Sequence, residues 1–345
     1  MKAAIFNPYL DTLGGGERYT LTFAKVLSEN LGYEVDIEWK DSDISKRIEE
    51  RFGFKLGKDI KFVQDTKRGD GYDLCFWVSD GSIPNLRSRF NIIHFQVPFH
   101  GVNGDSLLNK MKLFRVNLIV CNSQFTKSVI DSEYHVNSDI LYPPVGTKEF
   151  KPKRKENIIL YVGRFSKLTQ NKGQDILIEA FKKLSEDPLF KDWKLVLAGG
   201  TEIGTGDYLK HLKKMASGFN IEFVEKPKFP ELVDLYGKSK IFWSAGGFGV
   251  DEKVNPEKTE HFGMTLVEAM ASGLVPVVFN AGGHKEIISG GNFGLLWNNP
   301  EDLVEMTKDI VGNKKLFKMS KLSIAGAKLY DTSTFVKKIT ELIKK

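Results

Sequence analysis

Two carboxylates, Glu260 and Glu268, stand with seven residues between them around the sequence Phe262-Gly263-Met264. Gly263 allows a tight turn, and the run 265–271 predicts a buried helix that ends at Ser272-Gly273. A helix that begins near Met264 would aim its free N–H groups and its positive dipole end at a ligand. Each carboxylate can accept hydrogen bonds from a polyol, with a phosphate held between the two, an arrangement that suits a nucleotide sugar. The structural alternative is a surface glutamate followed by a capped core helix.

A pair of cations is the second candidate for chemistry. Arg164 and Lys172 flank the turn between an apolar strand, 158–162, and a helix with Ile176 and Leu177 on its apolar face. Arginine can hold a pyrophosphate with its planar fork and lysine as a point charge, and fixed cations there would stabilise the leaving-group charge. Two solvated loop charges are the alternative, and the carboxylate pair downstream favours the functional interpretation.

A glycine-rich turn, Gly14-Gly15-Gly16, follows the first apolar strand, 2–7, and precedes a helical pattern at 19–27. Strand, glycine turn and helix allow backbone N–H groups to approach a phosphate. The turn has neither the dinucleotide-binding spacing nor a P-loop lysine, so a flexible connector is the alternative.

His94 is the fourth candidate, because it ends the predicted strand 90–95, and ligands bind beyond the carboxyl ends of parallel strands. A lone histidine is more often structural, and His94 is favoured over His100 because it ends the strand directly. Metal chemistry is not predicted: the sequence Asp41-Ser42-Asp43 precedes a helix that it would cap, and no other metal-ligand spacing occurs.

Strands alternating with helices predict an α/β protein with parallel doubly wound sheets. At 345 residues the chain fits two domains. We predict an N-terminal domain at 1–145, a charged linker at 146–157, a second domain at 158–330 and a final basic helix at 331–345. A second glycine turn, Gly282-Gly283, is expected to let backbone approach the ligand.

The net charge of +6 comes from 50 basic and 44 acidic side chains, which is compatible with an anionic substrate but not diagnostic. No apolar window reaches the length of a membrane span, and the first residues predict a strand rather than a signal peptide. Cys75 and Cys121 lie in apolar runs and are expected to be buried, reduced thiols in a cytosolic compartment. The segment 109–115 could rest on an anionic membrane, but an amphipathic helix with a solvated basic face is the favoured interpretation.

With these residues in place, the chain resembles glycosyltransferase family 4 over nearly its whole length. The stretches that carry the resemblance are the turn 14–17, Gly163-Arg164 with Lys172-Gly173, the segment 260–268 and Gly282-Gly283. Within that family, further stretches resemble the dolichol-linked α-1,2-mannosyltransferases of N-glycan assembly: 7–18, Asn122-Ser123 with Thr126-Lys127, Tyr142-Pro143-Pro144 and 260–263.

The resemblance implies a GT-B fold, in which two Rossmann-like domains face each other across a cleft and the last helix crosses back to the first domain. It implies a retaining, metal-independent glycosyltransferase that moves a hexose of the mannose or glucose type from a GDP- or UDP-sugar to a glycan or lipid-linked acceptor. The expected location is cytoplasmic, with possible peripheral contact at the inner membrane face, and no nucleic-acid partner. The alternatives are a nucleotide-sugar epimerase or hydrolase, or a non-catalytic nucleotide-sugar-binding protein.

The resemblance also assigns roles to residues. Arg164 and Lys172 would hold the donor diphosphate, Glu268 the ribose and Glu260 the donor sugar, and His94 would lie beside the reacting carbon. The Gly14, Gly15 and Gly16 backbone would touch the phosphate or the sugar, and the other donor-binding residues would be Gly163, Phe262, Gly263 and Met264.

Overall fold

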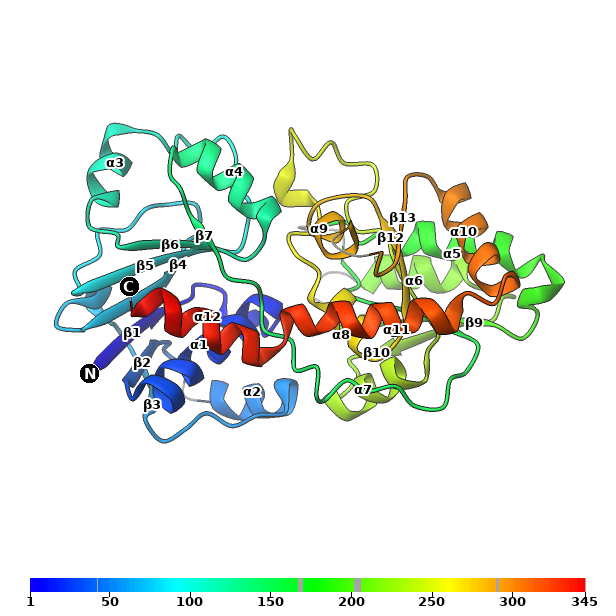
Figure 1. Ribbon diagram of the computed structural model, residues 1–345, viewed down its shortest axis with the longest axis horizontal. Helices are drawn as coiled ribbons and strands as arrows, with labels where there is room; N and C mark the ends of the chain where they lie inside the picture. Colours follow the sequence, from blue (N-terminus) through cyan, green and yellow to red (C-terminus); the bar gives the residue numbers. More distant parts are fainter. Residues whose placement is uncertain (42, 167–169, 202–205, 290–291, 345) are drawn as a thin grey trace. The chain divides into compact units, whose positions relative to one another are not determined.

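The computed structural model describes residues 1–41, 43–166, 170–201, 206–289 and 292–344 (Figure 1). The chain divides into two compact units. The first comprises Met1–Pro144 with Thr332–Lys345, and the second comprises Val145–Asp331. The segment predicted as a linker, 146–157, groups with the second unit.

The first unit is built on a seven-stranded sheet in which every neighbouring pair is parallel, in the order β3-β2-β1-β4-β5-β6-β7. This order reverses direction between β1 and β4, which is where ligands bind in doubly wound folds. The strands are β1 (Lys2–Phe6), β2 (Glu34–Glu38), β3 (Ile60–Val63), β4 (Leu74–Val78), β5 (Phe90–Phe95), β6 (Leu118–Cys121) and β7 (Asp139–Ile140).

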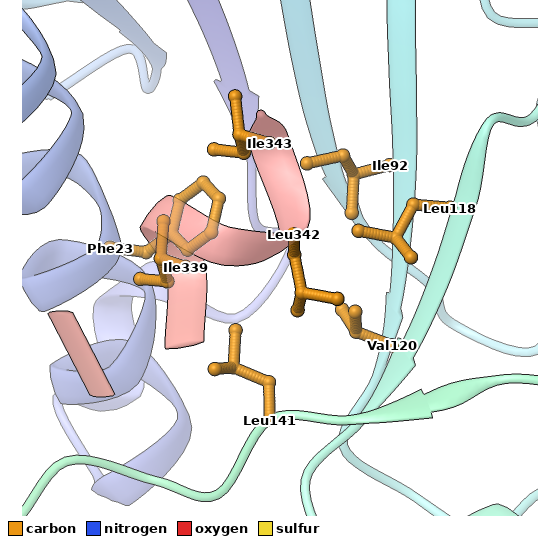
Figure 2. A pocket seen from close by; sticks show the side chains of 8 residues that line it. All are labelled: Phe23, Ile92, Leu118, Val120, Leu141, Ile339, Leu342 and Ile343. Carbon is orange, nitrogen blue, oxygen red and sulfur yellow. The ribbon is translucent and has the colours of Figure 1, made fainter. Parts of the chain in front are cut away.

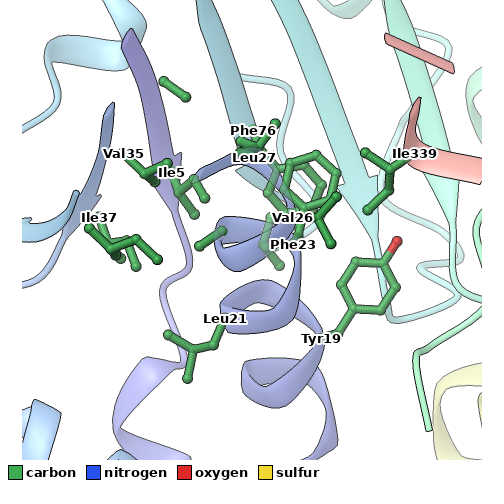
Figure 3. Packing of buried hydrophobic residues seen from close by; sticks show 14 of the residues in the cluster. Ile5, Tyr19, Leu21, Phe23, Val26, Leu27, Val35, Ile37, Phe76 and Ile339 are labelled. Carbon is green, nitrogen blue, oxygen red and sulfur yellow. The ribbon is translucent and has the colours of Figure 1, made fainter. Parts of the chain in front are cut away.

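The helices of the first unit include α1 (Gly15–Leu31), α2 (Ile44–Phe52), α3 (Leu107–Leu113) and α4 (Gln124–Tyr134), with 3-10 turns η1 (Leu10–Thr12) and η2 (Lys67–Gly69). Helix α1 packs Leu21, Phe23 and Leu27 against β1, β2 and β4 (Figure 3). It ends at Leu31 and is followed by Gly32, whose left-handed φ of 71° favours glycine.

The last helix, α12 (Thr332–Ile343), belongs to the first unit although the whole second unit precedes it in the chain. Its apolar face carries Ile339, Leu342 and Ile343, which lie opposite Phe23 of α1 and Ile92 of β5 (Figure 2). The small gap among these side chains is lined by apolar residues throughout, so it is part of the core rather than a ligand site.

The second unit repeats the architecture with a six-stranded parallel sheet in the order β10-β9-β8-β11-β12-β13. The direction of the order reverses between β8 and β11. The strands are β8 (Ile158–Val162), β9 (Lys194–Gly199), β10 (Ile221–Glu225), β11 (Ile241–Ser244), β12 (Val275–Phe279) and β13 (Leu295–Trp297).

Helices pack on this sheet around a core that contains Trp243, Trp297 and Phe181. They are α5 (Gln174–Ser185), α6 (Gly206–Met215), α7 (Phe229–Lys238), α8 (Met264–Ala271), α9 (Gly283–Ser289), α10 (Pro300–Gly312) and α11 (Leu316–Ala327). The 3-10 turns are η3 (Pro188–Phe190), η4 (Pro256–Lys258) and η5 (Lys328–Tyr330). No helix in the described parts of the chain is long and apolar enough to cross a membrane.

Several local predictions can be compared with the structure. Cys75 and Cys121 are buried and free, as predicted, and burial raises the pKa of each thiol to about 12. The helix after Asp41-Ser42-Asp43 is present, but Asp43 makes no capping bond; Asp41 instead accepts hydrogen bonds from the Asp43 N–H and from Arg47. Ser42 itself lies outside the described residues.

The favoured interpretation of the segment 109–115 is wrong. Helix α3 fully buries none of its residues: Leu113 is half-buried against the core, whereas the other large apolar side chains of the helix, and Phe114 directly after it, are exposed. The exposed fractions are 76% for Leu107, 61% for Leu108, 63% for Met111 and 93% for Phe114. An ordinary amphipathic helix would turn these side chains toward the core.

Candidate active site

The turn after β8 carries Gly163 and Arg164 at the carboxyl edge of the second sheet. The Gly163 N–H donates to Ala198 O at 2.9 Å, and a Cβ on Gly199 would lie 1.9 Å from Gly163 O. The two backbones are therefore in direct contact, which fixes the turn and explains the need for glycine at 199. The exposed Arg164 side chain extends from this turn, and its carbonyl accepts from Gln174 Nε2 at 2.8 Å.

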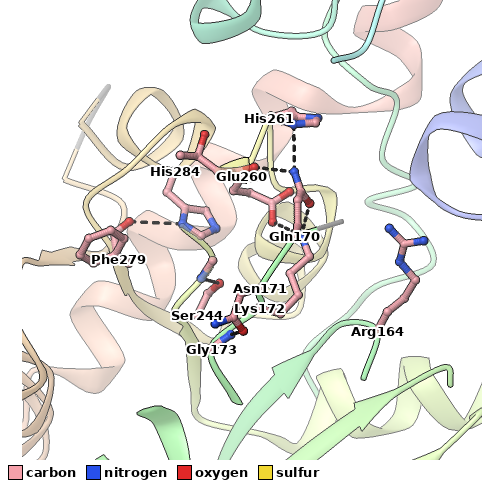
Figure 4. A network of polar contacts seen from close by, with 12 residues as sticks. Arg164, Gln170, Asn171, Lys172, Gly173, Ser244, Glu260, His261, Phe279 and His284 are labelled. Atoms are coloured by element: carbon pink, nitrogen blue, oxygen red, sulfur yellow. Dashed lines mark hydrogen bonds and ion pairs between the residues drawn. The ribbon is translucent and has the colours of Figure 1, made fainter. Parts of the chain in front are cut away.

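Lys172 and Glu260, 88 positions apart, meet at the same edge (Figure 4). Lys172 Nζ donates to Glu260 Oε2 and to Gln170 Oε1, each at 2.8 Å. The two side chains are only 16% and 22% exposed. An ammonium has three donors, so one N–H of Lys172 remains beyond these two contacts. Glu260 Oε1 accepts no hydrogen bond from any residue in the described ranges.

The charge of Glu260 is fixed by its neighbours. Partial burial raises its pKa, but the Lys172 ammonium and His284 outweigh this effect and bring the pKa from 4.5 to about 2. His284 lies 2% exposed with Nδ1 at 3.2 Å from Phe279 O, and its burial lowers the pKa of the imidazole. The site therefore holds a carboxylate, an ammonium and a neutral imidazole at neutral pH.

Gln170 was not identified from the sequence, although it organises this network. Its Nε2 donates to Thr259 O at 2.5 Å and to Glu257 O at 3.2 Å, and lies 2.9 Å from His261 Nε2. These bonds tie the loop before α5 to the segment before α8. The preceding residues 167–169 lie outside the described residues. No spacing rule marks Gln170, because its partners are about 90 residues away.

The helix predicted after Gly263 is confirmed: α8 runs from Met264 to Ala271 and ends at Ser272, with Gly273 at φ 74°. Gly263 has a φ of 112°, which excludes most other residues. Among the described residues, no acceptor contacts the N–H groups of Gly263, Met264 or Thr265. These donors and the helix dipole make the start of α8 suited to an anion.

Phe262, just before α8, and Glu268, within it, have buried side chains. Glu268 is 6% exposed and accepts from Tyr236 Oη at 3.0 Å, while Phe262 is 3% exposed and packs edge-on against Tyr330 with ring centroids 5.3 Å apart. The Phe262 side chain therefore belongs to the core, so only its backbone could contact a donor. The ribose-binding role of Glu268 stays a prediction.

The second glycine turn packs against protein backbone rather than standing open. A Cβ on Gly282 would lie 2.2 Å from Glu260 O, and one on Gly283 would lie 2.4 Å from Phe262 O. The Gly283 N–H also donates to Glu260 O at 2.7 Å. This turn therefore holds Glu260 in place, a role that the sequence did not indicate.

In the first unit, Gly15 and Gly16 form the first turn of α1 rather than a loop. Glu17 folds back to accept from the Gly14 N–H at 2.7 Å and from Thr12 at 2.8 Å. No described residue accepts from the N–H of Gly15 or Gly16. A Cβ on Gly16 would lie 2.0 Å from Gln96 Oε1, so glycine permits this close approach.

His94 does not directly end its strand, contrary to the prediction, because β5 continues to Phe95. The His94 ring is fully buried beneath α1, where it stacks on Tyr19 with centroids 4.3 Å apart, and Nδ1 lies 3.2 Å from Val120 O. His94 is the penultimate residue of β5, and its alternating position points the ring at the face that α1 covers. Burial lowers its pKa to about 3. Its role beside a reacting carbon stays a prediction.

Comparison with known proteins adds independent evidence. Residues 147–329 match the family described as glycosyl transferases group 1. The chain is 27% identical over 284 residues to an uncharacterized glycosyltransferase of Methanocaldococcus jannaschii, covering 77% of this chain and 71% of the relative. It is 25% identical over 431 residues to the GDP-Man:Man(3)GlcNAc(2)-PP-Dol alpha-1,2-mannosyltransferase of Dictyostelium discoideum, covering 98% and 83%.

Solved structures show the same fold. A glycosyltransferase from Rickettsia africae superposes with a TM-score of 0.77 at 19% identity, covering 100% of this chain and 98% of the other. Anabaena HepE, determined with UDP and glucose, gives a TM-score of 0.72 at 16% identity and covers 100% and 99%. The predicted α/β fold of GT-B type, with two Rossmann-like domains, is confirmed.

Proposed function

Because the chain belongs to the glycosyl transferases of group 1 and transfers a sugar from a nucleotide sugar, we propose that it is a retaining hexosyltransferase that needs no metal ion. Its donor would carry a hexose of the mannose or glucose type, and its acceptor would be a glycan or a lipid-linked glycan. GDP-mannose is the first donor to test, because the Dictyostelium relative bears that donor in its name.

The observation that carries the proposal is the Lys172–Glu260 pair, together with the start of α8, whose first N–H groups contact no acceptor among the described residues. The remaining N–H of Lys172 and the Arg164 fork would hold the two phosphates, together with the start of α8. Glu260 Oε1 would accept a hydrogen bond from a hydroxyl of the donor sugar. The cations and the start of α8 would thus bind the diphosphate, and Glu260 would bind the sugar.

In the proposed reaction the bond between the anomeric carbon and the diphosphate oxygen breaks, and the acceptor oxygen bonds to the same face of that carbon. A diphosphate oxygen takes the acceptor's proton. Charge grows on the diphosphate as its bond breaks, and cations that are already fixed stabilise this charge without reorganisation. This scheme needs no metal, because Arg164, Lys172 and the dipole of α8 would stabilise the negative charge on the diphosphate.

Arg164→Ala tests the proposal, with Arg154→Ala as a matched control on an exposed position outside the site. Transfer from GDP-mannose and UDP-glucose would be followed with and without a chelator. We expect a loss of about a hundredfold or more for Arg164→Ala and none for Arg154→Ala. Undiminished transfer in Arg164→Ala would overturn the diphosphate assignment. NMR of the product's anomeric proton tests retention, and epimerised donor or free sugar without acceptor would indicate the alternatives.

We also propose peripheral contact with an anionic membrane through α3. Its exposed side chains Leu107, Leu108, Met111 and Phe114 are interleaved with Lys110 and Lys112. Apolar side chains that enter the acyl boundary, beside cations that face anionic headgroups, suit such a surface. We expect Phe114→Ser to reduce flotation with phosphatidylglycerol vesicles. Phe317→Ser, at another exposed position on α11, is the control, and equal flotation of the two variants would contradict the proposal.

A further inference from the structure

One face of the first sheet is only partly covered over β1, β2 and β4: Ala4 and Cys75 on this face are buried in a core with Ile130 and Tyr134 of α4, but the side chains nearer the carboxyl ends are not. The connections β1–β2 and β2–β3 carry α1 and α2, but the connection from β3 to β4 contains only the short turn η2. Ala3, Ile5, Val35 and Ile37 lie in the core beneath α1. The alternating residues Phe6, Asp36, Glu38 and Trp77 therefore face the other side, where they are only half-buried.

A hollow of about 570 Å³ lies at the carboxyl ends of these strands. We call it the Trp77 hollow. Its volume is within the range of small-molecule sites. Its lining residues are Glu38, Lys40, Gln64, Asp65, Arg68 and Trp77.

An aromatic platform forms one wall of the Trp77 hollow. Trp77 of β4 stacks on Phe6 of β1, with ring centroids 3.8 Å apart and planes 18° from parallel. The two residues are neighbours in the strand register. Strands β1 and β4 are the pair at which the order of the sheet reverses, so the platform lies at the expected ligand position of this fold.

The charges of the hollow are not equally engaged. Glu38 Oε2 accepts from Thr66 N at 2.9 Å and from Thr66 Oγ1 at 2.7 Å, and Asp65 Oδ1 accepts from Lys67 N at 2.7 Å. In the described chain, by contrast, neither the Lys40 ammonium nor the Arg68 guanidinium has a hydrogen-bond or ion-pair partner. The carboxylates serve the η2 turn, and the cations remain available to a ligand.

The backbone at Lys67, Arg68 and Gly69 has left-handed φ values. Lys67 and Arg68 both have left-handed φ values, 50° and 55°, which few residues with side chains adopt. The next residue, Gly69, has a φ of 84°, and a Cβ there would lie 2.8 Å from Cys75 Cβ. Uncommon backbone conformations persist where the surroundings enforce them, and they concentrate at ligand sites.

We propose that the Trp77 hollow binds a sugar unit that carries an anionic group, either a phosphate or a carboxylate. The apolar face of the sugar ring packs on Trp77, and the anionic group lies between Lys40 and Arg68. The inference deepens the proposed function in one respect, because it identifies this unit as part of the acceptor. Binding itself does not depend on catalysis.

Fluorine NMR of the full chain with 5-fluorotryptophan tests the hollow directly. The chain has five tryptophans, and Trp77→Phe assigns the Trp77 signal. Glucose 1-phosphate and glucuronate separate the two anionic groups, methyl glucoside removes the charge, and inorganic pyrophosphate removes the sugar. We expect one or both anionic sugars to shift the Trp77 signal at concentrations where methyl glucoside and pyrophosphate do not. The signals of Trp193, Trp243 and Trp297 report any change in the second unit.

Charge variants complete the test. Arg68→Asn keeps a residue type that tolerates the left-handed backbone, and Lys40→Gln keeps the side-chain length. Each should weaken the Trp77 response to the anionic sugar by roughly fivefold, whereas Lys61→Gln, an exposed position outside the lining, should not. No shift of Trp77 with either anionic sugar, or a response unchanged in both charge variants, would overturn the proposal. Stabilisation of the chain by GDP or UDP tests the proposed function separately. The proposed donor-binding residues lie in the second unit and Trp77 lies in the first, so the Trp77→Phe variant should still be stabilised by the nucleotide.

Discussion

Replacing His94 by phenylalanine tests the buried position of that ring through its protonation. Burial lowers the pKa of His94 from 6.5 to about 3, with the contact to Val120 opposing the shift. The folded protein therefore excludes the charged imidazole, whereas the unfolded chain accepts a proton below its ordinary pKa. The contribution of the neutral His94 to the free energy of unfolding is therefore complete above pH 6.5. It is lost progressively as the pH falls from 6.5 toward 3.

The expected loss is roughly 1.4 kcal/mol per pH unit, or about 2 kcal/mol at pH 5 relative to neutral pH. His94→Phe removes the titrating group but keeps an aromatic ring against Tyr19. At neutral pH we expect the free energy of unfolding of the variant to be within about 1 kcal/mol of the wild-type value. At pH 5 it should be the more stable protein, because it has no imidazole to protonate.

Hydrogen exchange of amides in β5 and α1 is the appropriate assay, because two units need not unfold together. His211→Gln on the exposed surface of α6 is the control, and it should keep the pH dependence of the wild type. An equal pH dependence in the wild type and in His94→Phe would refute the reasoning. Loss of transfer in His94→Phe without loss of stability would support the predicted role beside the reacting carbon.

Three further predictions concern the second unit. In a double-mutant cycle of Lys172→Met and Glu260→Gln, the coupling should be about 1–3 kcal/mol in unfolding free energy, because the lysine largely sets the low pKa of the partly buried carboxylate; a value near zero would contradict the ion pair. Gly199→Ala should cost about 1–3 kcal/mol in urea unfolding, since its Cβ would meet backbone at 1.9 Å, whereas Gly57→Ala has open space and should cost much less. Tyr236→Phe should cost about 1–2 kcal/mol by removing the buried hydrogen bond to the α8 carboxylate, and a neutral result in the same assay would show that this bond contributes nothing.

The parts of the fold that the sequence could predict are those with local signals. The α8 helix was located from the glycines at 263 and 273 and the apolar run between them, and the structure has these bounds. The apolar strand β8 was located from its continuous apolar run in the same way. The two-residue strand β7 and the three-residue strand β13 were not predicted, because so few residues show no clear alternation.

The site was predicted in its charged groups but not in their supports. Arg164, Lys172 and Glu260 are polar residues that follow strands or precede a helix, and that pattern is visible in the chain. Gln170 and His284 act through partners distant in sequence, and no periodicity reveals such a contact. His94 shows the opposite failure: the end of a strand was identified, but the face toward which its side chain points depends on which side α1 covers.

The discontinuity of the first unit has a consequence for how the protein is made. Phe335, Ile339 and Leu342 belong to the core formed by α1 and the first sheet, yet they are synthesised after all of the second unit. During translation, the apolar surface of the first sheet that α12 covers therefore stays exposed until the last residues of the first unit are synthesised. The sequence of the second unit is complete before that point. The first domain to emerge is the last to be finished, and the nascent chain would be most vulnerable to aggregation there.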